Sequence, residues 1–306
     1  MDQVFHANRS NLLKVYNKSE KDIESDVNTI LATIRQQAHF PTFKEETLRR
    51  KIETYLIYTK FHYERTKKQL DLCYAYRHVY PEFFDNWDVC SPEFENNLDE
   101  CRCLPLPYLT TDLYRITLAE LTDKFVDKHF EPIVHMKIGI MSLEMRFQHD
   151  HNVSDILLFN CSKVNMGLIK KFTPSLIKKI SDVVIKGYSF RLAGAHLLYP
   201  PSSISILLNI FKLLIKPKLY ERIHLHSDLE SLHKVVPKEL LPKNYGGDLP
   251  DSQILADRWY EMLRNNRANL IEESKMRTDE SKRIDKLNDD EFFGSMHGSF
   301  KKLEFD

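Results

Sequence analysis

The chain has 306 residues, which is enough for one large domain or two smaller ones with a sizeable core. Its 44 basic and 44 acidic side chains balance, so the formal net charge at neutral pH is zero. Proteins that bind nucleic acid usually carry a basic excess, so we expect no nucleic-acid partner.

The cysteines and the N-terminus indicate a cytoplasmic protein. The five cysteines are irregularly spaced and form no Cys-x-x-Cys pair, which predicts free thiols in a reducing compartment. Cys101 and Cys103 have no second pair nearby to complete a metal site. The first residues lack the apolar core of a signal peptide, and no apolar run reaches transmembrane length. We therefore expect a soluble protein that contacts membranes only peripherally and transiently.

Three amphipathic helices are predicted near the N-terminus. Apolar residues recur at spacings of three and four over residues 20–37, 44–60 and 62–78. Pro41 interrupts the pattern between the first two helices. Because these helices are short and rich in charged residues, they predict a small helical subdomain within residues 1–90.

A loop, a strand and a long helical region follow. Residues 82–109 contain several prolines and are predicted to form a loop. Residues 115–118 are the first candidate strand, and residues 156–159 form a continuous apolar run that is typical of a strand covered on both faces. Between them, residues 122–148 predict one or two helices whose Met, Ile and Phe side chains can pack a core or line a deformable cavity.

The second half of the chain alternates between helices and strands. Thr173 and Pro174 begin a helix, as an N-cap and a first-position proline. Short apolar segments at residues 190–199 and 222–226 are predicted as strands. This alternation predicts a largely parallel sheet with crossover helices.

The segment between these two strands, residues 204–215, is apolar at every phase of a helical turn. A surface helix usually has one apolar stripe and one polar face, so both sides of this helix need a partner. It is too short to cross a bilayer, which takes ~20 residues. It is either a fully buried core helix or a lid with one face over an apolar cavity and the other against lipid. Lys212, Lys216, Lys218 and Arg222 cluster at its end, where lipid phosphate would lie.

The C-terminal part, residues 251–306, begins with a predicted helix over residues 251–270. Residues 272–291 are charged and poor in apolar groups, which predicts a mobile linker or an exposed helix. Residues 292–303 regain apolar character.

The sequence offers no complete catalytic set. Residues 187–191 come close to a Gly-x-Ser-x-Gly nucleophile elbow, but Arg191 replaces the second glycine and a helix leads into a strand there. Residues 149–151, His-Asp-His, indicate a solvated loop because spacing places no third metal ligand. His224 and His226 share one side of a strand and predict a satisfied pair beneath the C-terminal segment. We therefore expect no enzyme activity, metal or cofactor.

Three motifs in order resemble a known family. They are Gly-Ala-His-Leu-Leu at residues 194–198, Glu-Arg-Ile-His-Leu-His at residues 221–226 and Leu-Pro-Lys-Asn-Tyr-Gly-Gly at residues 241–247. This series is similar to the CRAL-TRIO lipid-binding domain family, in its branch with tocopherol transfer protein, retinaldehyde-binding protein and the clavesins. The resemblance extends over residues 20–270. Residues 292–303 resemble the C-terminal signature of insect members, which implies that they fold back onto the domain.

The resemblance implies an α/β fold with three parts. Residues 1–90 would form the helical N-terminal subdomain, residues 91–250 the CRAL-TRIO domain, and residues 251–306 a C-terminal helix and charged tail. In the CRAL-TRIO domain, a mostly parallel sheet and its helices would enclose a hydrophobic cavity beneath a lid helix. The implied function is intracellular binding and transfer of a tocopherol, retinoid, carotenoid or similar lipid between membranes, by a monomer. A lipid-regulated membrane adaptor and an enzyme acting on lipids stay open as alternatives.

The resemblance also implies two sets of site residues. The expected cavity wall consists of Met141, Phe159, Met166, Ile180, Val183, Val184, Tyr188, Ile206, Ile210, Phe211 and Leu214. Arg191, Lys218 and Arg222 stand where relatives contact the phosphoinositide of a membrane surface. The sequence departs from the family at two positions. Lys60 lies near, but does not replace, an arginine that contributes to this contact, and Asn160 stands where relatives often have aspartate.

Overall fold

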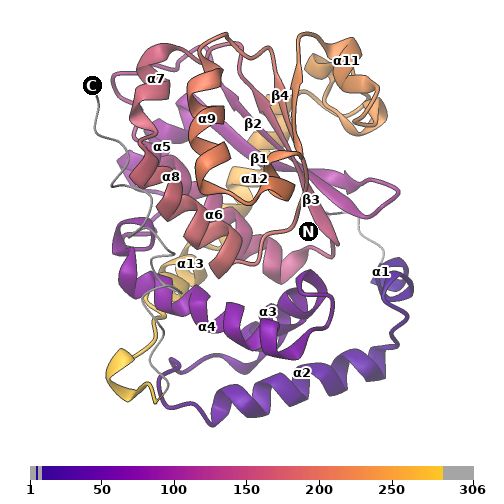
Figure 1. Ribbon diagram of the computed structural model, residues 1–306, viewed down its shortest axis with the longest axis vertical. Helices are drawn as coiled ribbons and strands as arrows, with labels where there is room; N and C mark the ends of the chain where they lie inside the picture. Colours follow the sequence, from indigo (N-terminus) through magenta and orange to yellow (C-terminus); the bar gives the residue numbers. More distant parts are fainter. Residues whose placement is uncertain (1–4, 6–8, 285–306) are drawn as a thin grey trace.

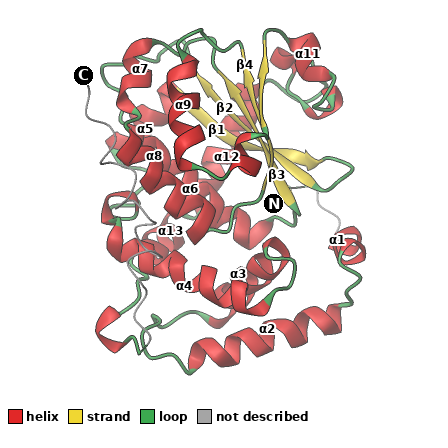
Figure 2. Cartoon of the chain, in the orientation of Figure 1, coloured by secondary structure: helices red, strands yellow, loops and turns green. Residues whose placement is uncertain are grey.

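The structure is a computed structural model that describes residue 5 and residues 9–284. Four helices at the N-terminus pack against one end of an α/β domain that contains a five-stranded sheet (Figures 1 and 2). The C-terminal segment passes over that sheet and returns to the N-terminal helices. The expected α/β fold with a mostly parallel sheet is confirmed.

The N-terminal helices are α1 Arg9–Val15, α2 Glu20–Arg35, α3 Glu45–Tyr58 and α4 Tyr63–Val79. The three predicted helices are confirmed to within two residues at each end. A capping box begins α2, because the Ser19 side chain accepts from the backbone of Asp22 and the Asp22 carboxylate accepts from the backbone of Ser19.

The predicted loop over residues 82–109 is wrong. This region contains a short 3-10 turn, then α5 Pro92–Glu100, and then the strand β1 Cys101–Leu109. Pro105 and Pro107 suggested a loop, yet β1 is an edge strand, where a residue without an N–H can point its backbone away from the sheet. The pairing of β1 with its neighbour shifts between Pro105 and Leu109, so the prolines also mark an irregularity in the strand.

The sheet has the order β1-β2-β3-β4-β5. The other strands are β2 Tyr114–Leu121, β3 Ser154–Asn160, β4 Leu192–Leu198 and β5 Ile223–His226. β1 is antiparallel to β2, and the remaining neighbours are parallel. Residues 115–118, which were predicted as the first strand, therefore belong to the second strand, β2, because β1 was not predicted.

The helices that connect the parallel strands all cover one face of the sheet. They are α6 Pro132–His149, α7 Met166–Lys171, α8 Pro174–Ser181, α9 Ile204–Leu214 and α10 Pro217–Tyr220. Parallel strands that follow one another across a sheet are joined by right-handed crossovers, which places every connection on the same side. We call this side the front face, and Figure 1 shows α6, α8 and α9 together on one side of the strands.

Two helix boundaries differ from expectation. α6 begins only at Pro132, and residues 122–131 are turns. The Thr173 hydroxyl accepts from the backbone of Leu176 and caps α8, as predicted, and the helix then continues as a π-helical turn to Gly187.

The C-terminal segment crosses the back face of the sheet as far as Ser252, and then runs along the β1 edge toward α6. This segment contains α11 Leu229–His233, α12 Ser252–Asn265, α13 Arg267–Ser274 and three 3-10 turns. The predicted helix over residues 251–270 is therefore interrupted at Asn266. None of the helices in the described ranges is long and apolar enough to cross a membrane.

The mobile linker or exposed helix expected after residue 272 is wrong for the part up to residue 284. Residues 272–274 complete α13, and the next residues are held on the N-terminal helices. Arg283 donates to both carboxylate oxygens of Asp71 at 2.5 and 2.7 Å, and Arg277 pairs with Asp85. The expectation for residues 292–303 lies outside the described residues.

Candidate functional site

Contacts on the two sides of the sheet identify which strand residues face which way. On the front, Arg146 of α6 donates to Asp155 of β3 at 2.5 Å. On the back, Glu120 of β2 accepts from Tyr245 and Ser252 of the C-terminal segment at 2.5 and 2.6 Å. Because side chains alternate along a strand, the odd-numbered residues of β2 and β3 face the front and the even-numbered ones face the back.

The front face is apolar and only partly covered. The strand register aligns Leu157 of β3 with Ala195 of β4, and Phe159 with Leu197. The Phe159 side chain is 37% exposed and Leu225 of β5 is 51% exposed. On the back face, by contrast, residues such as Leu158 are fully buried. The sheet therefore presents accessible apolar surface toward the crossover helices.

The apolar helix α9 lies outside the core. It packs against α7 and α8, with Ile204 buried, Ile206 43% exposed and Leu213 78% exposed. Ile210 and Phe211 are partly covered. The interpretation of this segment as a fully buried core helix is therefore wrong, and α9 has apolar side chains on both its inner and its outer side.

The expected wall residues fall into two groups. Eight of them keep accessible surface on the sheet, on α7, on α8 and the π-helical turn after it, or on α9. They are Phe159, Met166, Ile180, Val184, Ile206, Ile210, Phe211 and Leu214. Met141, Val183 and Tyr188 are instead buried in the main core. The Tyr188 hydroxyl donates to Glu144 at 2.5 Å, so this side chain belongs to a packed polar contact.

A hollow of about 440 Å³ elsewhere contains none of the expected wall residues. It lies between α5 and the start of α6, and Glu93, Asn97 and Glu131 are among its lining residues. Its acidic lining does not suit an apolar ligand.

The residues expected to contact a phosphoinositide lie at the end of the sheet where β4 and β5 begin. Arg191 precedes β4 and Arg222 precedes β5, and these strands are parallel neighbours. Arg222 donates to the carbonyl of Leu192, while Arg191 donates to the hydroxyl of Tyr16 at 3.0 Å. Lys218 of α10 is exposed. The structure thus places these two arginines close together and leaves the lysine nearby in solvent.

A buried ionic cluster joins the N-terminal helices to the rest of the protein. Lys51 of α3 lies 2.7 Å from Glu144 and 2.6 Å from Glu273, and Arg77 of α4 contacts the same two carboxylates. Both cations are completely buried. Burial alone would raise the pKa of Glu273, but Lys51 and Arg77 outweigh it and lower this pKa to about 2. The sequence analysis missed this cluster, although Lys51 stands on the apolar side of its helix.

The solvated loop predicted for the His-Asp-His segment, residues 149–151, is wrong at Asp150, which is buried in a second ionic cluster. Asp150 accepts from Arg115 at 2.5 and 2.9 Å and from Arg146 at 3.2 Å. Burial favours the protonated acid, yet the two arginines prevail and lower the pKa of Asp150 to about 2. The described part of the chain contains no group of three or more potential ligands that could hold a metal ion. Asp150 therefore has a structural role, in which it joins Arg115 to Arg146.

Ser189, in the segment that resembles a nucleophile elbow, donates its hydroxyl hydrogen bond to Gln69 at 2.5 Å.

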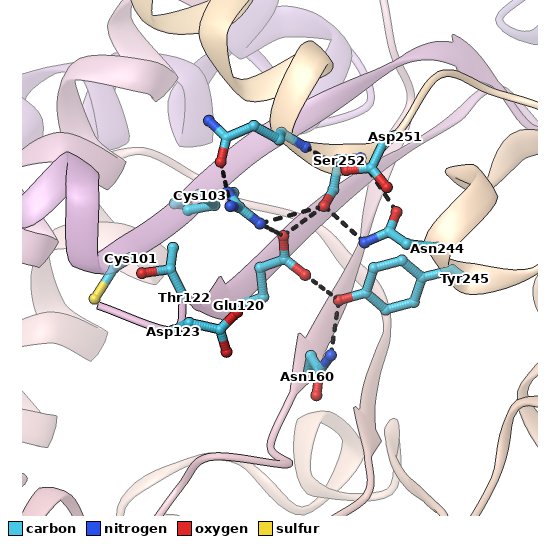
Figure 3. A network of polar contacts seen from close by, with 12 residues as sticks. Cys101, Cys103, Glu120, Thr122, Asp123, Asn160, Asn244, Tyr245, Asp251 and Ser252 are labelled. Carbon is cyan, nitrogen blue, oxygen red and sulfur yellow. Dashed lines mark hydrogen bonds and ion pairs between the residues drawn. The ribbon is translucent and has the colours of Figure 1, made fainter. Parts of the chain in front are cut away.

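The third motif fastens the C-terminal segment to the back of the sheet (Figure 3). The Tyr245 hydroxyl donates to Glu120 and accepts from Asn160 at 2.9 Å, so Asn160 has a structural partner. Gly246 has a φ of +74°, and a Cβ on Gly247 would lie 2.0 Å from the Leu241 carbonyl oxygen. The Tyr-Gly-Gly sequence is thus required by a tight turn.

His224 and His226 of β5 both contact a third histidine, His196 of β4. Nδ1 of His196 lies 2.9 Å from Nε2 of His226, and His224 stacks on His196 with ring centroids 5.1 Å apart. Burial and the neighbouring rings lower the pKa of His196 to about 4. His226 is buried and has His196 as its partner, while His224 is exposed, so the two histidines of β5 do not form the predicted satisfied pair.

Comparisons with known proteins agree with this architecture. The CRAL/TRIO domain profile matches residues 111–247, and the Pinta-like UBA domain profile matches residues 19–94. An alpha-tocopherol transfer protein-like protein of Mus musculus is 25% identical over 191 residues, which cover 61% of this chain and 55% of the relative. Clavesin-1 of Rattus norvegicus is 33% identical over 96 residues, or 31% of this chain and 27% of the relative.

The crystal structure of Sfh5 has 12% sequence identity and a TM-score of 0.46, and the match covers 87% of this chain and 99% of that one. The chain spans about half the length of the tocopherol transfer protein-like relatives it matches. The matched profile at residues 111–247 coincides with the parallel sheet and its crossover helices. Residues 111–247 therefore match the CRAL/TRIO domain family, and the chain is similar to alpha-tocopherol transfer protein-like proteins and to clavesins.

Proposed function

We propose that this protein binds one small hydrophobic molecule between the front face of the sheet and helices α8 and α9, and carries it between membranes without chemical change. The observation that carries this proposal is the accessible apolar surface on both sides of that space. Phe159 and Leu225 contribute it from the sheet, and Phe211 and Leu214 contribute it from the side of α9 that carries the buried Ile204.

The hydrophobic effect is sufficient to retain such a ligand. Removing apolar surface from water yields about 25 cal/mol per Å². A ligand that buries a few hundred Å² gains roughly several kcal/mol on this scale, and it also covers the exposed surface of the protein. The proposal therefore needs no covalent bond and no catalytic residue.

The same surfaces provide a route to a membrane. The proposed contact inserts the outer side of α9, including Leu213, while Lys218, Arg191 and Arg222 meet the phosphate of a phosphoinositide. A guanidinium has five N–H donors, so each arginine keeps donors beyond its hydrogen bond to Tyr16 or Leu192. We propose that the protein is cytoplasmic and that it binds the membrane only while α9 opens and the ligand exchanges.

Mass spectrometry of lipids extracted from the purified protein tests the binding step, and exchange of labelled ligand between liposomes tests transfer. Phe211→Asp places a charge on the inner side of α9, seven residues after the buried Ile204, and is expected to abolish both. Val235→Asp is the matched control, since Val235 is 57% exposed near α11. The proposal is wrong if the protein contains no hydrophobic molecule and liposomes exchange no ligand.

A further inference from the structure

The hollow of about 440 Å³ between α5 and the start of α6 is separate from the space proposed for the lipid. α5 packs against α6, and one side of α5 and the turns before α6 form the walls of the hollow. Four carboxylates line it, against one lysine and one histidine. They are Glu93, Asp99, Glu100 and Glu131, with Lys124 and His129. Because opposite charges attract, this lining favours a cationic ligand.

Most of these carboxylates have no counter-ion within the protein. Asp99 lies 2.8 Å from Lys124, so this pair is neutral as a whole. The other three carboxylates of the lining form no ion pair within the described ranges, and they are Glu93, Glu100 and Glu131. The hollow therefore brings together carboxylates that the rest of the described chain leaves uncompensated.

The floor of the hollow contains an unsatisfied hydrogen-bond acceptor. Asn97 lines the hollow and is only 5% exposed, and its Oδ1 has no hydrogen-bond partner among the described residues. It lies one helical turn from both Glu93 and Glu100, so its side chain projects from the side of α5 that faces the hollow. Buried polar atoms are nearly always hydrogen-bonded. The partner that Oδ1 lacks is a donor, and a cation with N–H groups can supply it.

The lining suits an organic cation better than a metal ion. The described residues include no group of three or more potential ligands that could hold a metal. A guanidinium has five N–H donors and an ammonium has three, so either can serve several separated acceptors. Lys137 follows the lining residue Val134 by one turn, but its ammonium lies 5.9 Å from the ring centroid of the core residue Phe94 and outside the lining.

We propose that this hollow is a second binding site, for a small organic cation with two charged nitrogen groups. One of them, a guanidinium or a primary ammonium, donates to Oδ1 of Asn97 and to Glu100, and the other lies beside the exposed carboxylates of Glu93 and Glu131. A volume of about 440 Å³ falls within the range of small-molecule sites, which favours a free ligand over a segment of another protein.

Calorimetric titration of the purified full chain with three guanidines that share a four-carbon chain tests this inference. Agmatine ends in an ammonium, butylguanidine in a methyl group and 4-guanidinobutanoate in a carboxylate. At low ionic strength, where exposed charges are least screened, agmatine is expected to bind about fivefold more tightly than butylguanidine. The third compound is expected to bind more weakly than either, because its carboxylate is repelled by the lining.

Substitutions on α5 assign this preference to the named groups. Asn97→Leu removes the amide at nearly the same shape and is expected to weaken agmatine binding about tenfold. Its melting temperature is expected to equal or exceed that of the wild type, because it removes an unpaired polar atom. Glu100→Gln is expected to weaken agmatine binding as well. Glu95→Gln is the matched control, since Glu95 is outside the lining and lies 3.4 Å from Arg264.

A third variant keeps the test decisive if Asn97→Leu fails to fold. Asn97→Asp adds a carboxylate at the floor and is expected to bind agmatine more tightly than the wild type. Without ligand its melting temperature is expected to fall, because a buried charge lacks a partner, and agmatine is expected to restore it.

Four results would overturn the inference. They are equal affinity for the three guanidines, agmatine binding that is unchanged in both Asn97→Leu and Glu100→Gln, displacement of agmatine by an equal concentration of Mg²⁺, and tighter binding of the peptide Gly-Arg-Arg-Gly than of agmatine. The last would assign the hollow to a partner protein. Each leaves the proposed lipid function standing, because the hollow contains none of the expected wall residues.

Discussion

At the scale of single residues, the most consequential charges are buried ones. Lys51→Met is expected to destabilise the protein by about 3–5 kcal/mol, because Glu144 and Glu273 would remain buried near each other with one cation fewer. Urea denaturation measures this loss. Lys44→Met is the control, since the Lys44–Glu272 pair is exposed and is worth about 0–1 kcal/mol. Equal losses in the two variants would contradict the structural role of the cluster.

The same residues predict how stability depends on acidity. The pKa values of Glu273 and Asp150 are lowered to about 2 from 4.5 and 3.8. Their stabilisation is therefore complete above their unfolded-state pKa values and is lost as the pH falls through about 4.5 toward 2. Asp150→Asn is expected to flatten this acid limb when the free energy of unfolding is measured against pH. An unchanged acid limb in that variant would show that Asp150 does not contribute.

At the scale of elements, α9 separates stability from function. Leu213 is 78% exposed, so Leu213→Glu is expected to change the free energy of unfolding by less than about 0.5 kcal/mol. The same change places a negative charge where we propose membrane insertion, so liposome binding and ligand transfer are expected to fall. Sedimentation with liposomes and the transfer assay measure this. Full transfer by Leu213→Glu would refute insertion of the outer side of α9.

Helices whose apolar residues recur at a regular spacing could be predicted from the sequence, whereas an edge strand that contains prolines could not. The spacing of apolar residues located α2, α3 and α4, although only α2 has a single buried stripe and α4 is buried on every side from Leu72 to Arg77. β1 was missed because Pro105 and Pro107 exclude an inner strand, whereas only the assembled sheet shows that β1 is at an edge. Met141, Val183 and Tyr188 were expected in the cavity wall, and only the packed chain shows that they belong to the main core.

At the scale of the whole molecule, the two faces of the sheet have different roles. Leu158→Ala removes a fully buried side chain from the back and is expected to cost about 2–5 kcal/mol. Phe159→Ala, one residue further along β3, removes a partly exposed side chain and is expected to cost about 1–2 kcal/mol while weakening ligand binding. Urea denaturation and binding of labelled ligand compare the two. Equal destabilisation, with ligand binding affected equally, would contradict the division between the faces.

The anchoring of the C-terminal segment through Tyr245 and Glu120 has a consequence for evolution. Its hydrogen bonds from Tyr245 and Ser252 use Glu120 and Asn160, which point away from the crossover helices. Selection can therefore exchange the alternate residues of each strand, such as Thr117, Ala119 and Phe159, without disturbing that anchor. A lineage that meets a new lipid can adapt its specificity by single substitutions, while the scaffold that keeps the protein folded is inherited intact.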